Sequence, residues 1–204
     1  MQLDTDLTGL FGITLAIATL LVRLPQVQAL PLLRRAGTLA AAIIVISIPL
    51  WGVSLAGFVR GMTGDLSIAT LALLALALAS SFAERVLVEE QNRLKMLQAI
   101  LIAAVLFYPL ALGISMFDPY RLGYGNLWFM VALLGLAAWS SLRYSTLFAL
   151  CIALAVAAWS AGWYESPNLW DYLLDPWLAV YAFAVQVKIW VKLGLARWRK
   201  KTNA

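Results

Sequence analysis

Residues 144–164 decide the fold class, and they read YSTLFALCIALAVAAWSAGWY. This stretch contains no charged side chain. A helix of about 20 apolar residues spans a hydrocarbon core about 30 Å thick, so the stretch is long enough to cross a membrane. Six further runs are comparably apolar, although several of them are shorter. In chain order the seven runs are 7–24, 37–59, 66–83, 96–117, 127–142, 144–164 and 176–196.

The composition of the whole chain points the same way. Of the 204 residues, 63% are apolar and 12% are charged, whereas soluble domains average about 45–50% and about 25%. This balance excludes a soluble globular protein and an intrinsically disordered one. We therefore predict an all-α, polytopic integral membrane bundle of about seven transmembrane helices. It forms a single transmembrane domain over residues 1–204, with no soluble domain.

The basic residues predict the orientation of the bundle. If the N-terminus is outside, 13 of the 15 Lys and Arg residues fall in inner segments, and Arg60 and Arg121 alone face out. An inner excess of positive charge predicts an N-out, C-in topology. Asp4 and Asp6 replace the positive charge that begins a secretory signal, so we expect the first helix to remain as a span. The predicted location is the cell inner (plasma) membrane, multi-pass, with the basic tail 192–201 on anionic lipid.

Several kinds of chemistry are excluded by what the sequence lacks. The chain has no histidine and one cysteine, Cys151, so it has no imidazole ligand and no internal disulfide. The nucleotide-binding patterns GxxxxGK[ST] and GxGxxG and the nucleophile pattern GxSxG are not found. We therefore expect no cofactor, no metal and no nucleic-acid partner.

Small residues recur at helical spacing in the apolar runs. Ala149, Ala153, Ala157 and Ala161 fall on one face of the sixth run. Such faces allow helix backbones to approach closely in lipid. The expected partners are therefore the lipid bilayer and, through these small-residue faces, another membrane protein.

Two prolines and one charged segment shape the predicted helices. Pro49 and Pro109 lie inside the second and fourth runs, where we expect each to kink its helix. The inner segment 84–95 has no Gly or Pro, and Glu89 is spaced to pair with both Arg85 and Arg93 on one helical face. It is predicted to be a solvated helical extension, with a docking surface for a cytoplasmic partner as the alternative.

Two segments between runs carry most of the polar and aromatic side chains on the predicted outer side. They read FDPYRLGYGN (117–126) and WYESPNLWDYLLDPW (163–177). Helix caps and an aromatic belt at the interface explain this composition, and so does a surface for a polar or glycan-like ligand. The candidate ligand residues on this outer rim are Asp118, Tyr120, Arg121, Glu165, Asn168, Trp170 and Asp171.

We also expect the two outer segments to meet, because each is short and hangs from helices adjacent in sequence. Arg121 is the one basic residue in either segment, and it is predicted to pair with an acid of residues 165–175. Asp175 followed by Pro176 predicts an N-cap and the start of the last helix.

The last run carries an intramembrane polar stripe. Trp177, Tyr181, Lys188 and Lys192 fall on one helical face. Tyr181 and Lys188 are the candidate functional residues of this stripe. Lys188 either extends its side chain to the inner interface or lines an internal polar groove.

Three classes of function remain open. The first is a non-enzymatic accessory or assembly component of a membrane or envelope system, which agrees with the near absence of charge at membrane depth. The second is a small transporter or channel, suggested by the prolines and Lys188. The third is a membrane enzyme acting on a lipid-linked or glycan substrate at the outer rim.

Overall fold

The computed structural model describes residues 2–50, 52–83 and 85–202 and is mainly helical. The side chains of residues 2–4, 197 and 199–202 lie outside the described part, so the roles expected of Asp4 and the basic tail stay predictions. The elements in chain order are α1 (Gln2–Val22), α2 (Pro25–Gln28), α3 (Leu32–Ser47), β1 (Pro49–Leu50), β2 (Val53–Ser54), α4 (Leu55–Thr63), α5 (Ile68–Ala83), α6 (Glu90–Ala111), η1 (Pro119–Gly123, a 3-10 helix), α7 (Leu127–Arg143), α8 (Thr146–Ser160), α9 (Trp170–Leu173) and α10 (Pro176–Thr202).

Helix length and composition give the chain the character of a membrane protein. Among the described residues, three helical segments are long and apolar enough to cross a membrane: Thr5–Val22, Glu90–Ala111 and Pro176–Ala196. Three further apolar helices are shorter, namely α5, α7 and α8.

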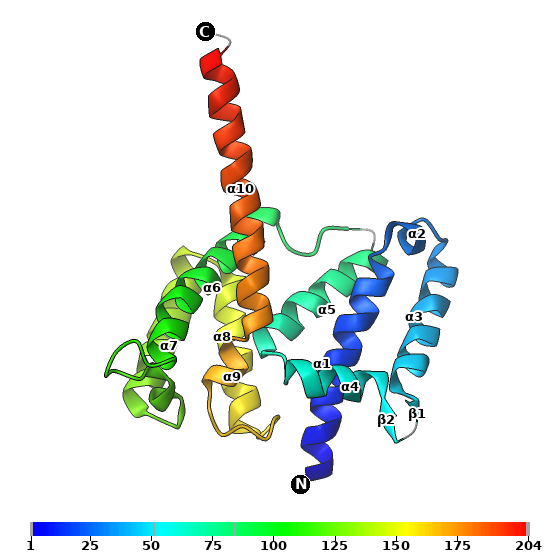
Figure 1. Ribbon diagram of the computed structural model, residues 1–204, viewed down its shortest axis with the longest axis horizontal. Coiled ribbons are helices and arrows are strands. Elements are labelled where there is room, and N and C mark those ends of the chain that lie inside the picture. Colours follow the sequence, from blue (N-terminus) through cyan, green and yellow to red (C-terminus); the bar gives the residue numbers. More distant parts are fainter. Residues whose placement is uncertain (1, 51, 84, 203–204) are drawn as a thin grey trace.

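The long helices run between two ends of the molecule (Figure 1). One end, here the α9 end, holds the N-terminus, the β1–β2 hairpin, α4 and α9. The other, here the α2 end, holds α2 and the connection between α5 and α6, and the second half of α10 projects beyond it.

Two groups of helices make up the bundle. In the first, α1 packs against α3, α4 and α5, and in the second α6 packs against α10 and α8. Helix α8 also contacts α5 and α7, and so joins the two groups. Buried side chains such as Ile13, Leu71 and Ile152 form one core, and Met96, Ile100 and others form the second.

The expected span over residues 37–59 is not a single helix. Helix α3 ends at Ser47, and an antiparallel hairpin pairs Pro49 with Ser54 before α4 begins. Pro49 has no N–H to donate to the helix, so the chain turns there instead of kinking. Gly52, with φ of 92°, occupies the turn, and Ser54 caps α4 by accepting from the Gly57 amide. Pro109, in contrast, stays inside α6.

The segment 84–95 is also not a continuous helical extension. Helix α5 ends at Ala83 and α6 begins at Glu90, with Glu89 in the N-cap position. Arg93 binds Glu90, three residues away, through two hydrogen bonds of 2.9 and 2.6 Å. The expected pairing of Arg93 with Glu89 is therefore wrong, because Glu89 lies before the first helical turn.

Candidate functional site

The segments 117–126 and 163–177 meet at the α9 end, as expected. The Leu169 amide donates to the carbonyl of Gly123, the Asn168 side-chain amide to that of Tyr120, and the Trp170 indole to that of Pro119, each at 2.9 Å. Each bond joins η1 to the chain at or just before α9. The two segments thus form one polar junction.

Close packing holds this junction together. A Cβ on Gly123 would overlap the side chains of Asn168 and Trp170, so this position requires glycine. The Trp170 ring lies 4.8 Å from that of Phe129 and 4.2 Å from that of Phe107, which ties α9 to α7 and α6.

Asp171 is the charged centre of the junction. Its carboxylate accepts from the Tyr120 hydroxyl at 3.0 Å and from the Ser166 hydroxyl. Burial, with the nearby Asp171 charge adding to it, raises the pKa of the Tyr120 phenol above its usual value. Tyr120 therefore remains a neutral hydrogen-bond donor through physiological pH.

The other candidate ligand residues of the rim have other contacts or positions. Asp118 accepts from the Tyr120 amide at 2.9 Å and so caps η1. Glu165 is exposed and lines a separate surface hollow beside Arg60. The structure brings together Tyr120, Asn168, Trp170 and Asp171, but not all seven candidates.

The predicted ion pair of Arg121 is wrong. Its side chain is exposed and makes no ion pair within the described residues. Two of the acids expected to pair with it have other partners: Asp171 accepts from hydroxyl groups, and Asp175 is buried among other donors.

Arg60 is the arginine that joins segments at the α9 end. It binds Asp65 through two hydrogen bonds of 2.6 and 3.1 Å and Asp6 at 2.7 Å, and these bonds raise its pKa above the ordinary value. A Cβ on Gly9 would overlap Arg60 and Asp65. Glycine in α1 therefore lets this pair lie against the helix, a signal that sequence reasoning missed.

Asp175 caps α10, as predicted, and also holds α5. Its Oδ1 accepts from the Leu178 amide at 2.8 Å. Its Oδ2 accepts from the Ser67 amide at 3.0 Å, from the Ser67 hydroxyl at 2.7 Å and from the Thr70 hydroxyl. The carboxylate is 3% exposed, so it is fully committed to joining two helix N-termini.

Arg35 plays a similar part at the α2 end. Its guanidinium donates to the carbonyl of Ser81 at the end of α5, and to those of Gln28 and Leu30 around the end of α2. One cation thus binds the carbonyls at two helix ends.

A cleft lies between α1, α5 and α10. It consists of two adjoining cavities of about 510 and 480 Å³ that share Arg23, Leu73, Ala77, Arg93 and Tyr181. Its deeper part is lined largely by apolar side chains of α1 and α5, and it lies between the two helix groups. Apart from Tyr181, sequence reasoning missed these residues.

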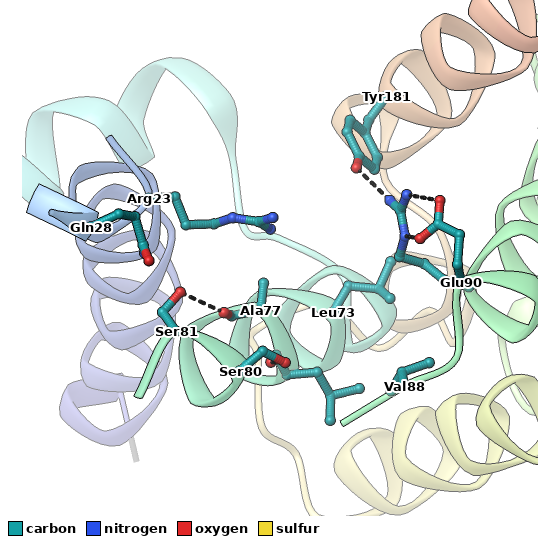
Figure 2. Close-up of a pocket in the computed structure, with 11 residues that line it drawn as sticks. Arg23, Gln28, Leu73, Ala77, Ser80, Ser81, Val88, Glu90 and Tyr181 are labelled. Carbon is teal, nitrogen blue, oxygen red and sulfur yellow. Dashed lines mark hydrogen bonds and ion pairs between the residues drawn. The ribbon is translucent and has the colours of Figure 1, made fainter. Parts of the chain in front are cut away.

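The polar mouth of the cleft lies at the α2 end (Figure 2). Arg23 extends into it from the end of α1. Across the cleft, Arg93 donates to the Tyr181 hydroxyl at 2.9 Å and is bound to Glu90. The side chain of Arg23 is exposed and makes no hydrogen bond or ion pair with any described residue.

The polar stripe of α10 divides between two environments. The Trp177 indole donates to the carbonyl of Thr63 at 3.3 Å, and Tyr181 faces the mouth of the cleft. Lys188 is exposed, on the part of α10 that lies beyond the cleft.

A further cavity, of about 230 Å³, is almost entirely apolar. It lies among α6, α7, α8 and α9, and its lining includes Met96, Phe129, Cys151 and Trp170. Cys151 is buried in this lining and packs as a small apolar side chain against Met96.

No group of three or more His, Cys, Asp or Glu side chains within the described residues is arranged to hold a metal ion. Compared with family models, with curated proteins and with solved structures, the chain matches none of them.

Proposed function

We propose that this chain is a non-enzymatic, multi-pass accessory or assembly component of the cell inner membrane, with seven spans and an N-out, C-in topology. The spans are the six apolar helices α1, α5, α6, α7, α8 and α10, with α3, whose residues 37–47 carry no charged side chain, as the seventh. Their alternating course between the two ends, with the start of α1 and the end of α10 at opposite ends, supports an odd number of crossings (Figure 1). The 13-to-2 division of basic residues supports the orientation.

One observation carries the non-enzymatic assignment: four charged side chains on the predicted outer side make their hydrogen bonds within the fold. Asp118 and Asp175 cap helices, Asp171 joins two segments, and Arg60 binds two acids. A catalytic acid or base needs a proton-transferring atom turned toward a substrate. The bonds of these side chains are directed into the protein instead.

Cysteine labelling tests the topology. Arg121→Cys and Gln91→Cys each place a thiol at an exposed position, in a background in which Cys151 is replaced by Ala. A membrane-impermeant maleimide should label position 121 on intact cells and position 91 after permeabilisation alone. The opposite pattern would disprove the orientation.

Substitution of the rim acids tests the absence of catalysis. Three variants are each expressed in cells from which the gene for this protein is deleted: Asp118→Asn, Asp171→Asn and Glu165→Gln. Each variant should reverse the defect caused by the deletion to an extent set by the amount of variant protein in the membrane. If one variant accumulates normally in the membrane and restores nothing, the rim-enzyme alternative is favoured.

The cleft favours a second candidate function, which is transport. A passage needs a polar lining or a movable wall, and the cleft has one polar mouth and an apolar interior. Solute uptake into proteoliposomes that depends on Arg23 or Tyr181 would support a transporter over an accessory component.

A further inference from the structure

The cleft between α1, α5 and α10 has the shape and chemistry of a site for one amphiphile. Its deep cavity is lined by apolar side chains such as Ile13, Ile17, Leu73 and Leu74. From Ile13 to Arg23 the helix rises about 15 Å. That length equals about half of a hydrocarbon core about 30 Å thick, which is the depth of one leaflet.

The cleft is bounded differently at its two ends. At the far end, the Trp177 indole binds the carbonyl of Thr63 and joins α10 to α4. At the α2 end, the larger cavity collects Arg23, Arg93, Glu90 and Tyr181. An acyl chain placed along the apolar part would therefore have its headgroup at the arginines.

Charge at the mouth selects the headgroup. Glu90 neutralises Arg93, and together with the Tyr181 hydroxyl it fixes the position of that guanidinium. Arg23 reaches into the mouth with no partner among the described side chains (Figure 2). The charged groups that line the mouth therefore sum to one net positive charge, which a guanidinium can direct at a phosphate.

From these features we infer that the cleft binds one anionic glycerophospholipid, its acyl chain along α1 and α5 and its phosphate at Arg23. This lipid comes from the leaflet next to the α2 end. The inference goes beyond an accessory role and does not depend on it. A zwitterionic lipid has the same phosphate but adds a cation, which the arginines disfavour. Free phosphate lacks the chain that the apolar cavity accepts.

Native mass spectrometry of the purified protein tests this inference. Phosphatidylglycerol and phosphatidylcholine with identical chains are titrated separately, and inorganic phosphate is added as a competitor. The unaltered protein should bind one phosphatidylglycerol about tenfold more tightly than phosphatidylcholine, as one charge-assisted contact provides. Millimolar phosphate should not displace it.

Two matched pairs of variants locate the site. Arg23→Gln should abolish the preference for the anionic lipid, whereas Arg34→Gln, at another exposed arginine of the same end, should keep it. Ala77→Phe fills the cleft and should weaken the binding of both lipids by at least about tenfold. Ala79→Phe, on the exposed face of α5, should leave the binding of both lipids unchanged.

Three results would overturn the inference. They are an unchanged preference in Arg23→Gln, unchanged lipid binding in a folded Ala77→Phe protein, and displacement of the lipid by phosphate alone. The side chain of Arg23 makes no bond to any residue that the structure describes, so its variant remains decisive if Ala77→Phe does not fold.

Discussion

Among single substitutions at the α9 end, we expect Asp175→Ala to lower the free energy of unfolding the most. The carboxylate is 3% exposed and accepts four hydrogen bonds, one from α10 and three from the start of α5. Removing it leaves the Ser67 amide without its acceptor inside the protein.

The expected loss follows from these contacts. A hydrogen bond to a charged group contributes about 1.5–3 kcal/mol, and a helix N-cap contributes about 1 kcal/mol. The Ser67 hydroxyl keeps its contact with Thr70, so the bonds do not add fully. We expect Asp175→Ala to lower the free energy of unfolding by about 3–5 kcal/mol. Asp175→Asn keeps one acceptor oxygen, but its amide group faces hydroxyl donors. We expect this variant to lower the free energy of unfolding by about half as much as Asp175→Ala.

Unfolding in mixed micelles with increasing SDS, followed by circular dichroism, measures this loss. Glu165→Ala is the matched control, because this acid lies in the same segment with an exposed side chain, and its loss should stay within about 0.5 kcal/mol. If Asp175→Ala costs less than about 1 kcal/mol, or no more than the control, Asp175 does not join α5 to α10 as argued.

Three further outcomes are expected from the same assay. A double-mutant cycle of Tyr120→Phe with Asp171→Asn should give a coupling of about 1–2 kcal/mol, and a coupling near zero would mean that this bond does not join the two outer segments. Arg35→Met should cost about 2–4 kcal/mol, because the carbonyls that end α2 and α5 lose their donor, and a neutral result would contradict that role. Lys188→Met should change stability by less than about 0.5 kcal/mol, since the side chain is exposed, whereas a large loss would reveal an internal partner.

Local features of the candidate sites could be predicted from the sequence. Asp175 before Pro176 specifies a cap and a helix start because both effects act within four residues. Short connections between neighbouring helices likewise bring η1 to the chain around α9. The identity of the pairing arginine could not be predicted, because Arg60 and Arg121 each have an aspartate within five residues and the fold decides which arginine binds its neighbour.

The sequence by itself determined that the chain is helical and apolar enough for a membrane, because hydropathy sums over neighbouring residues and needs no tertiary contact. It did not determine where the run 37–59 breaks, since an apolar composition permits both a long helix and the hairpin at Pro49. The cleft was decided by tertiary structure alone. It exists because α1 packs on α5 while α10 packs on α6, and the space between two such pairs depends on contacts between residues far apart in the chain.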